Sequence, residues 1–192
     1  EAILRQYPQF FSQALSNRRD WNVQILYTQV NRGSNGVPEL TTHHFNTNPA
    51  RYFYPASTVK LPIVLLALQK LGELKDKGID RNTTMITETD FSGQTSVYND
   101  PTTPEGRPTI AQYIKKILLV SDNDAYNRLY EFLGQEYINT ELYKKGYRDA
   151  QILHRLNIFL TDTENRHTNP VRFLGKNNEV LYQQPGQFNT AR

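Results

Sequence analysis

The chain has 192 residues, of which 38% are hydrophobic and 21% charged, a composition typical of globular proteins rather than disordered or fibrous ones. This length suffices for one domain with a hydrophobic core and is short for two, so we expect a single domain over residues 1–192. The formal net charge is +3 and the basic residues are scattered among acidic ones, which argues against a nucleic-acid partner.

The first part of the chain carries helical and strand patterns in turn. Apolar residues at helical spacing predict one amphipathic helix over residues 3–15. Alternating side chains on either side of a turn rich in Gly and Asn predict a β-hairpin within residues 21–48. A nearly continuous apolar run then predicts a helix over residues 58–70 that is buried on most of its circumference.

The middle of the chain is predicted to be helical. Periodic apolar residues, together with residues typical of helix caps, predict three further helices, over residues 109–120, 124–134 and 135–145. Residues 57–146 are therefore expected to form a helical region. Beyond it we expect mainly loop, with one short strand around residues 180–182.

The residue types present limit the chemistry of the chain. There is no cysteine, and the four histidines lack the spacing of metal ligands, so we expect neither a metal nor another cofactor. No apolar run approaches the roughly 20 residues of a membrane-spanning helix. No signal peptide opens the chain, so the protein is expected either to be cytoplasmic or to have lost such a peptide.

An S-x-x-K motif, residues 57–60, stands at the start of the apolar helix. Residues three apart share a helix face, so the Lys60 amine is expected beside the Ser57 hydroxyl. Apolar neighbours would desolvate the amine and lower its pKa, which suits it to take the hydroxyl proton and make the serine nucleophilic. Such a motif arises by chance in about half of chains this long, so a helix-capping serine beside a solvent-directed lysine is the alternative.

An S-D-N tripeptide, residues 121–123, lies between two predicted helices. This tripeptide arises by chance in roughly a few per cent of chains of this length. Its alternative is a plain capping turn, because all three residue types favour helix N-caps. In this order the two motifs resemble those of the serine β-lactamase and penicillin-binding-protein superfamily, and of class A β-lactamases in particular. The order of the predicted elements is similar to that family over most of the chain.

The resemblance implies an α+β fold of the β-lactamase/DD-peptidase type and a serine hydrolase or acyltransferase site. Ser57 would attack a β-lactam or peptide-like amide to form an acyl-enzyme, Lys60 would accept its proton, and Ser121 would relay a proton to the leaving nitrogen. Asn123 would bind the substrate's amide, and Tyr98 would be an aromatic wall of the cleft or else an ordinary surface or core tyrosine. A small-molecule or peptidoglycan-like substrate and a periplasmic or secreted bacterial location follow from the same resemblance.

One departure from the family pattern concerns deacylation. In class A enzymes an acidic residue on an Ω-loop, soon after an Arg-Leu pair, activates the water that releases the acyl group. Here Arg155-Leu156 lies within an Ω-loop-like segment and tail over residues 150–192, and Leu160 falls where that acid is expected. Asp162 and Glu164 are the candidate replacement bases. We therefore do not expect fast hydrolysis, and a penicillin-recognising or non-catalytic binding module is the alternative function.

A second departure is that no K-T-G or K-S-G triad occurs in the sequence. In the family the strands that carry this motif pair with the N-terminal hairpin, so we expect an incomplete sheet and an N-terminal fragment. The remaining C-terminal part of the same polypeptide is then an expected partner. An esterase or peptidase that ignores β-lactams is a further alternative, because substrate pockets are not legible from one sequence.

Overall fold

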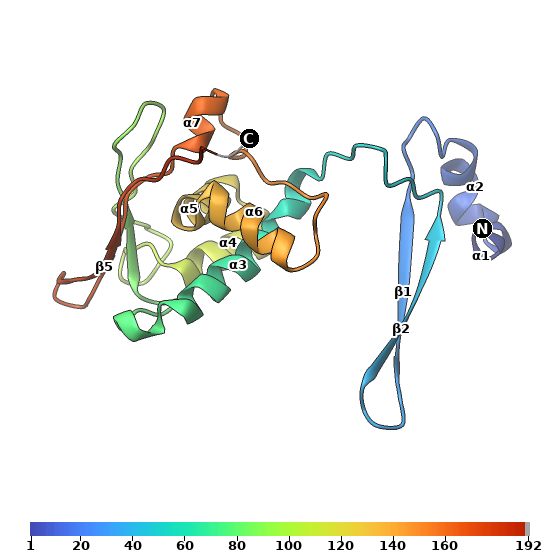
Figure 1. Cartoon of the computed structure of the whole chain (residues 1–192), viewed down its shortest axis with the longest axis horizontal. Helices are drawn as coiled ribbons and strands as arrows, with labels where there is room; N and C mark the ends of the chain where they lie inside the picture. Colours follow the sequence, from blue (N-terminus) through green and yellow to red (C-terminus); the bar gives the residue numbers. More distant parts are fainter. Residues whose placement is uncertain (191–192) are drawn as a thin grey trace. The chain divides into compact units, whose positions relative to one another are not determined.

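The structure is a computed structural model that describes residues 1–190 (Figure 1). Contacts divide the chain into two compact units, residues Glu1–Tyr54 and a second unit that begins at Pro55. The division describes which residues contact one another and does not show whether each unit folds independently. The single domain over residues 1–192 therefore stays a prediction. Helices and antiparallel strands occur together, and the predicted α+β fold is confirmed.

The first unit consists of α1 (Ala2–Gln6), α2 (Pro8–Ser16) and the strands β1 (Ile25–Arg32) and β2 (Pro38–Phe45). The prediction of one continuous N-terminal helix is wrong, because the chain leaves helical geometry at Tyr7, with φ −123° and ψ 60°. The cause is Pro8, whose ring disfavours helical geometry in the preceding residue and which has no N–H for the helix ladder.

The predicted hairpin is confirmed as the antiparallel pair β1–β2, in which Ile25 lies opposite Phe45 and Arg32 opposite Pro38. The two strands form a sheet of their own, and none of their residues is buried. The sheet is therefore incomplete, as expected from the sequence. A two-stranded ribbon without a covered face is marginally stable by itself.

The second unit contains a short 3₁₀ turn, η1, that leads into a group of helices, and a three-stranded antiparallel sheet in the order β3-β4-β5. In this sheet Thr84 lies opposite Leu174, and Val171 opposite Gln184. The elements are η1 (Ala56–Val59), α3 (Lys60–Glu73), η2 (Lys75–Lys77), β3 (Thr84–Thr87), α4 (Ile110–Val120), α5 (Asn123–Leu133), α6 (Gln135–Lys144), α7 (Asp162–Arg166), β4 (Val171–Leu174) and β5 (Val180–Gln184).

Helix α5 lies at the centre of this unit and packs against α3, α4 and α6 (Figure 1). Residues 125–133 are all buried, and five large side chains of this stretch are completely inaccessible: Tyr126, Leu129, Tyr130, Phe132 and Leu133. Burial of each such side chain stabilises the fold by about 1.5–3 kcal/mol. The start of α5, which carries the S-D-N motif, is thereby fixed to the core.

Helix α3 is buried over most of its circumference and leaves one stripe of side chains exposed. Its residues Ile63 and Ala67 are inaccessible, whereas Leu61, Leu65 and Leu68 are 55%, 58% and 40% exposed. The prediction that this helix is buried on most sides is therefore confirmed, and the exposed leucines are confined to one stripe along it. An apolar pattern reports which residues avoid water, and it does not report whether a neighbour is present to cover them. Along residues 1–190, no helix has both the length and the apolar character needed to cross a membrane.

Candidate active site

Ser57 and Lys60 lie together because η1 continues directly into α3. The Ser57 side chain is exposed, whereas Lys60, the first residue of α3, is only 4% exposed. The Nζ atom of Lys60 lies 3.3 Å from the Ser57 hydroxyl oxygen. A spacing of three residues therefore sets a buried amine beside an accessible hydroxyl.

The S-D-N residues reach the same amine from the junction of two helices. Helix α4 ends at Val120, and its C-cap residue Ser121 has left-handed geometry with φ 54°. Asp122 caps α5 by accepting the Ala125 N–H at 2.8 Å. This abrupt turn directs the side chains on either side of Asp122 toward α3. Lys60 Nζ lies 2.9 Å from the Ser121 hydroxyl oxygen and 2.7 Å from Asn123 Oδ1, and it also donates to the Ser121 carbonyl.

The hydrogen-bonding groups around Lys60 Nζ indicate which protonation state of the amine they favour. The Ser121 carbonyl and Asn123 Oδ1 only accept hydrogen bonds, whereas the hydroxyls of Ser57 and Ser121 both donate and accept. A neutral amine has two N–H groups for the two obligate acceptors, which leaves its one lone pair to accept the proton of either hydroxyl. Burial lowers the pKa of Lys60, against the opposing charge of Asp122. The arrangement therefore suits an amine that takes a proton from a hydroxyl.

Backbone strain lies on both sides of the cluster. Ala56, immediately before the exposed serine, and Ser121 have φ values of 47° and 54°, which non-glycine residues rarely adopt. Left-handed geometry costs roughly 1–2 kcal/mol for such residues. Strain of this kind persists where the surrounding structure holds it, and it gathers at functional sites.

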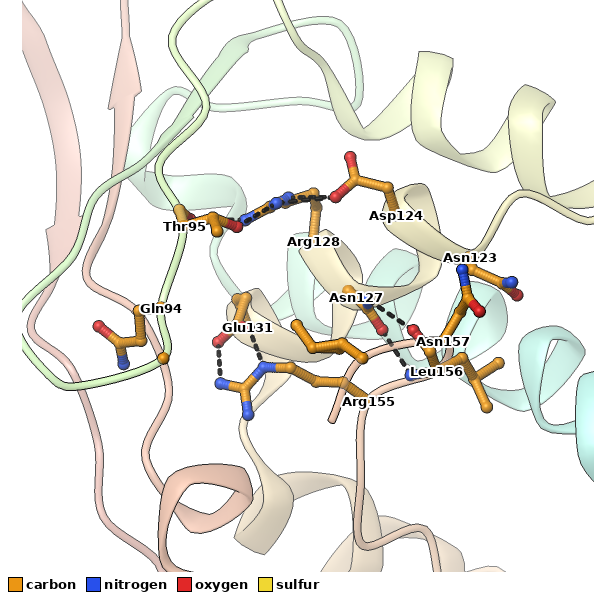
Figure 2. Close-up of a pocket in the computed structure, with 12 residues that line it drawn as sticks. Gln94, Thr95, Asn123, Asp124, Asn127, Arg128, Glu131, Arg155, Leu156 and Asn157 are labelled. Atoms are coloured by element: carbon orange, nitrogen blue, oxygen red, sulfur yellow. Dashed lines mark hydrogen bonds and ion pairs between the residues drawn. The ribbon is translucent and has the colours of Figure 1, made fainter. Parts of the chain in front are cut away.

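A pocket of about 260 Å³ adjoins the cluster at Asn123. Figure 2 shows residues of α5 between a segment at 93–95 on one side and a segment at 155–158 on the other. The lining of the pocket is rich in amide and charged side chains. The residues that line it are Gly93, Gln94, Thr95, Asn123, Asp124, Asn127, Arg128, Glu131, Arg155, Leu156, Asn157 and Ile158.

Two side chains of α5 anchor the 155–158 wall. Asn127 donates to the Leu156 carbonyl at 3.0 Å and accepts the Leu156 N–H at 2.8 Å. Glu131 forms a buried ion pair with Arg155, in which Nη2 of Arg155 lies 2.9 Å from Oε2 of Glu131. Sequence reasoning missed both residues. The available signal was a polar stripe at helical spacing, Asn123, Asn127 and Glu131, on a helix otherwise buried in the core.

The two carboxylates named as candidate deacylation bases do not lie at this cluster. Glu164 closes a capping box with Thr161, accepting its N–H and its hydroxyl at 2.8 Å each, and it also accepts the Ser92 hydroxyl at 3.2 Å. These hydrogen bonds, that of the Thr161 N–H first, lower the pKa of Glu164. The Asp162 side chain is 86% exposed and lies 3.7 Å from Arg166. Both serve the first turn of α7, and neither lines the pocket.

Two further residues from the sequence analysis also lie outside the cluster. Tyr98 is 48% exposed and does not line the pocket. Leu160 is half-buried, and its Cδ2 atom would lie 2.6 Å from a Cβ at position 93, so it packs against Gly93. Within residues 1–190, no three or more His, Cys, Asp or Glu side chains are grouped so as to hold a metal ion.

A serine, a buried lysine and a second serine in one hydrogen-bonded cluster of an α+β protein define a candidate serine hydrolase site. A sequence model of the Beta-lactamase enzyme family matches residues 11–185. The match covers most of the chain, so the chain belongs to this family of hydrolases, whose substrates are β-lactams. The resemblance to the β-lactamase superfamily is thereby confirmed. No curated protein and no solved structure matched the chain.

Proposed function

We propose that Ser57 is the nucleophile of an acyl-transfer site that acts on β-lactams or peptide-like amides through an acyl-enzyme. The observation that carries this proposal is the buried Lys60 amine within hydrogen-bonding reach of two hydroxyls, at 3.3 Å from Ser57 and 2.9 Å from Ser121. A periplasmic or secreted location belongs to the proposal, because peptidoglycan-like substrates occur outside the cytoplasm.

The proton path of acylation follows from these contacts. Lys60 Nζ takes the Ser57 hydroxyl proton as Oγ bonds to the substrate carbonyl carbon. The carbon–nitrogen bond then breaks, the leaving nitrogen takes the Ser121 hydroxyl proton, and Lys60 returns a proton to Ser121. Backbone N–H groups in the first turn of a helix have no intrahelical acceptor, so the N–H of Ser57 is suited to stabilise the oxyanion.

Asn123 is the proposed substrate-orienting residue. Its Oδ1 accepts from Lys60 at 2.7 Å, which fixes the orientation of the amide and leaves the Nδ2 group as a donor. Because Asn123 also lines the pocket, a substrate carbonyl bound by Nδ2 would direct the acyl side chain into that space.

The pocket gives a specific reason to expect slow deacylation. Two acidic residues line the pocket. Glu131 is occupied by Arg155 and by the Asn169 N–H at 2.8 Å, and Asp124 is hydrogen-bonded to Arg128 rather than to Ser57, Lys60 or Ser121. Without a positioned base the acyl group would remain on Ser57. This favours, as a second candidate function, a module that recognises β-lactams covalently without turning them over.

Labelling with a fluorescent penicillin, followed by peptide mass spectrometry, tests the proposal. We expect label on Ser57 in the wild type, none in Ser57→Ala, and at least a hundredfold slower labelling in Lys60→Met, which removes the general base, worth roughly 10²–10⁴-fold. Lys115→Met, which removes an exposed lysine of α4, is the matched control. Equal labelling of Ser57→Ala would refute the proposal. Turnover of a chromogenic cephalosporin then separates an enzyme from a covalent sensor.

A further inference from the structure

Asp124 differs from the other charged residues that line the pocket. Glu131 and Arg155 neutralise each other in a buried pair, with side chains only 3% exposed. The Asp124 side chain is 64% exposed, and Arg128 binds it only through Oδ1, at 3.1 Å from Nε and 2.7 Å from Nη2. Within residues 1–190, no hydrogen bond involves Oδ2. One carboxylate oxygen is thus open beside the candidate active site.

Arg128 holds this carboxylate in place. Its side chain is only 8% exposed and extends from α5 to the opposite wall, where it donates to the Thr95 carbonyl and to the Thr95 hydroxyl, each at 2.7 Å (Figure 2). Because the guanidinium is fixed at both ends, Asp124 loses little freedom when a ligand binds. Such preorganisation lowers the entropic cost of recognition.

We propose that Asp124 is a specificity-determining residue that binds an ammonium group on the acyl side chain of the substrate, an inference that rests on the proposed function. Asp124 and Asn123 are adjacent and line the same pocket. A substrate amide held by Asn123 would therefore bring a primary amine next to that amide within reach of Oδ2. The favoured substrates are β-lactams or peptide-like amides with such an amine.

The test compares two penicillins that differ only by this amine, ampicillin and benzylpenicillin. The readout is the ratio of their second-order rate constants for acylation of Ser57. We expect Asp124→Asn to lower the ampicillin-to-benzylpenicillin ratio about fivefold, the upper range for an exposed ion pair. Asp124→Glu should retain most of the preference. Asp149→Asn, at an exposed residue that does not line the pocket, should leave the ratio unchanged. High salt should shrink the wild-type preference, because it screens exposed charges.

The outcomes separate this inference from the proposed function. A ratio that is the same in Asp124→Asn and in the wild type overturns the role of Asp124, including the case in which both compounds react more slowly because the carboxylate supports only the first turn of α5. If neither compound labels Ser57 in the wild type, the proposed function fails and the inference fails with it. Melting temperatures of the variants show that each chain is folded.

Discussion

Removal of the buried ion pair between Glu131 and Arg155 offers a quantitative test of how the pocket wall is held. Both side chains are only 3% exposed. Without Glu131, the Arg155 guanidinium keeps two acceptors within residues 1–190, the carbonyls of Glu164 at 3.1 Å and His167 at 2.6 Å. The Asn169 N–H loses its hydrogen bond to Glu131. A buried charge left unpaired costs about 3–5 kcal/mol. We therefore expect Glu131→Leu and Arg155→Met each to lower the free energy of unfolding by about 3 kcal/mol.

The double variant Glu131→Leu/Arg155→Met should lose less stability than either single variant, because it leaves no uncompensated charge. Urea unfolding monitored by circular dichroism measures all three free energies. Lys144→Met is the control: the lysine side chain is 63% exposed, and its partner Glu141 keeps a hydrogen bond from the Gln69 amide, so the loss should be under about 1 kcal/mol. Strict additivity of the two single losses would show that the pair is not coupled and would refute this account of the wall.

Two further predictions concern α3 and its start. Burial lowers the pKa of Lys70 to about 8, with Glu73 opposing. In the unfolded chain the pKa of this lysine is near 10.5, so between pH 8 and 10.5 the unfolded state binds more protons than the folded state. The free energy of unfolding should therefore rise with pH across this window by up to about 3 kcal/mol. The rise should vanish in Lys70→Met. Ala56→Gly should leave the free energy of unfolding within about 1 kcal/mol of the wild type, because strain release offsets added chain entropy, while acylation of Ser57 slows. Ala67→Gly, within α3, should cost more than about 1 kcal/mol in the same unfolding assay.

Local spacing explains what the sequence could predict. The S-x-x-K spacing on one helix places Ser57 beside Lys60 by geometry alone. The helices α4, α5 and α6 follow from apolar periodicity and from their caps, as Thr109 shows by accepting the Gln112 N–H at 3.1 Å. The approach of Ser121 and Asn123 to the same amine was expected only from the family resemblance, since no local pattern links α3 to the end of α4.

Non-local pairing explains most of what was missed. Strands β3 and β4 are short, and β3 acquires its partner only through contacts such as that of Thr84 with Leu174, far apart in the sequence. The roles of Asn127 and Glu131 likewise depend on a distant loop. The break between α1 and α2 is different, because Pro8 was legible and its effect on Tyr7 could have been predicted.

The pH dependence of acylation at Ser57 tests most directly whether Lys60 is the proton acceptor. We predict that the rate constant rises with pH, with a midpoint below the usual lysine value of 10.5, because burial lowers the pKa of Lys60. Lys60→Met should abolish this rise while the chain remains folded. A rate that is independent of pH, or the same profile in Lys60→Met, would contradict the assignment of Lys60 as the base.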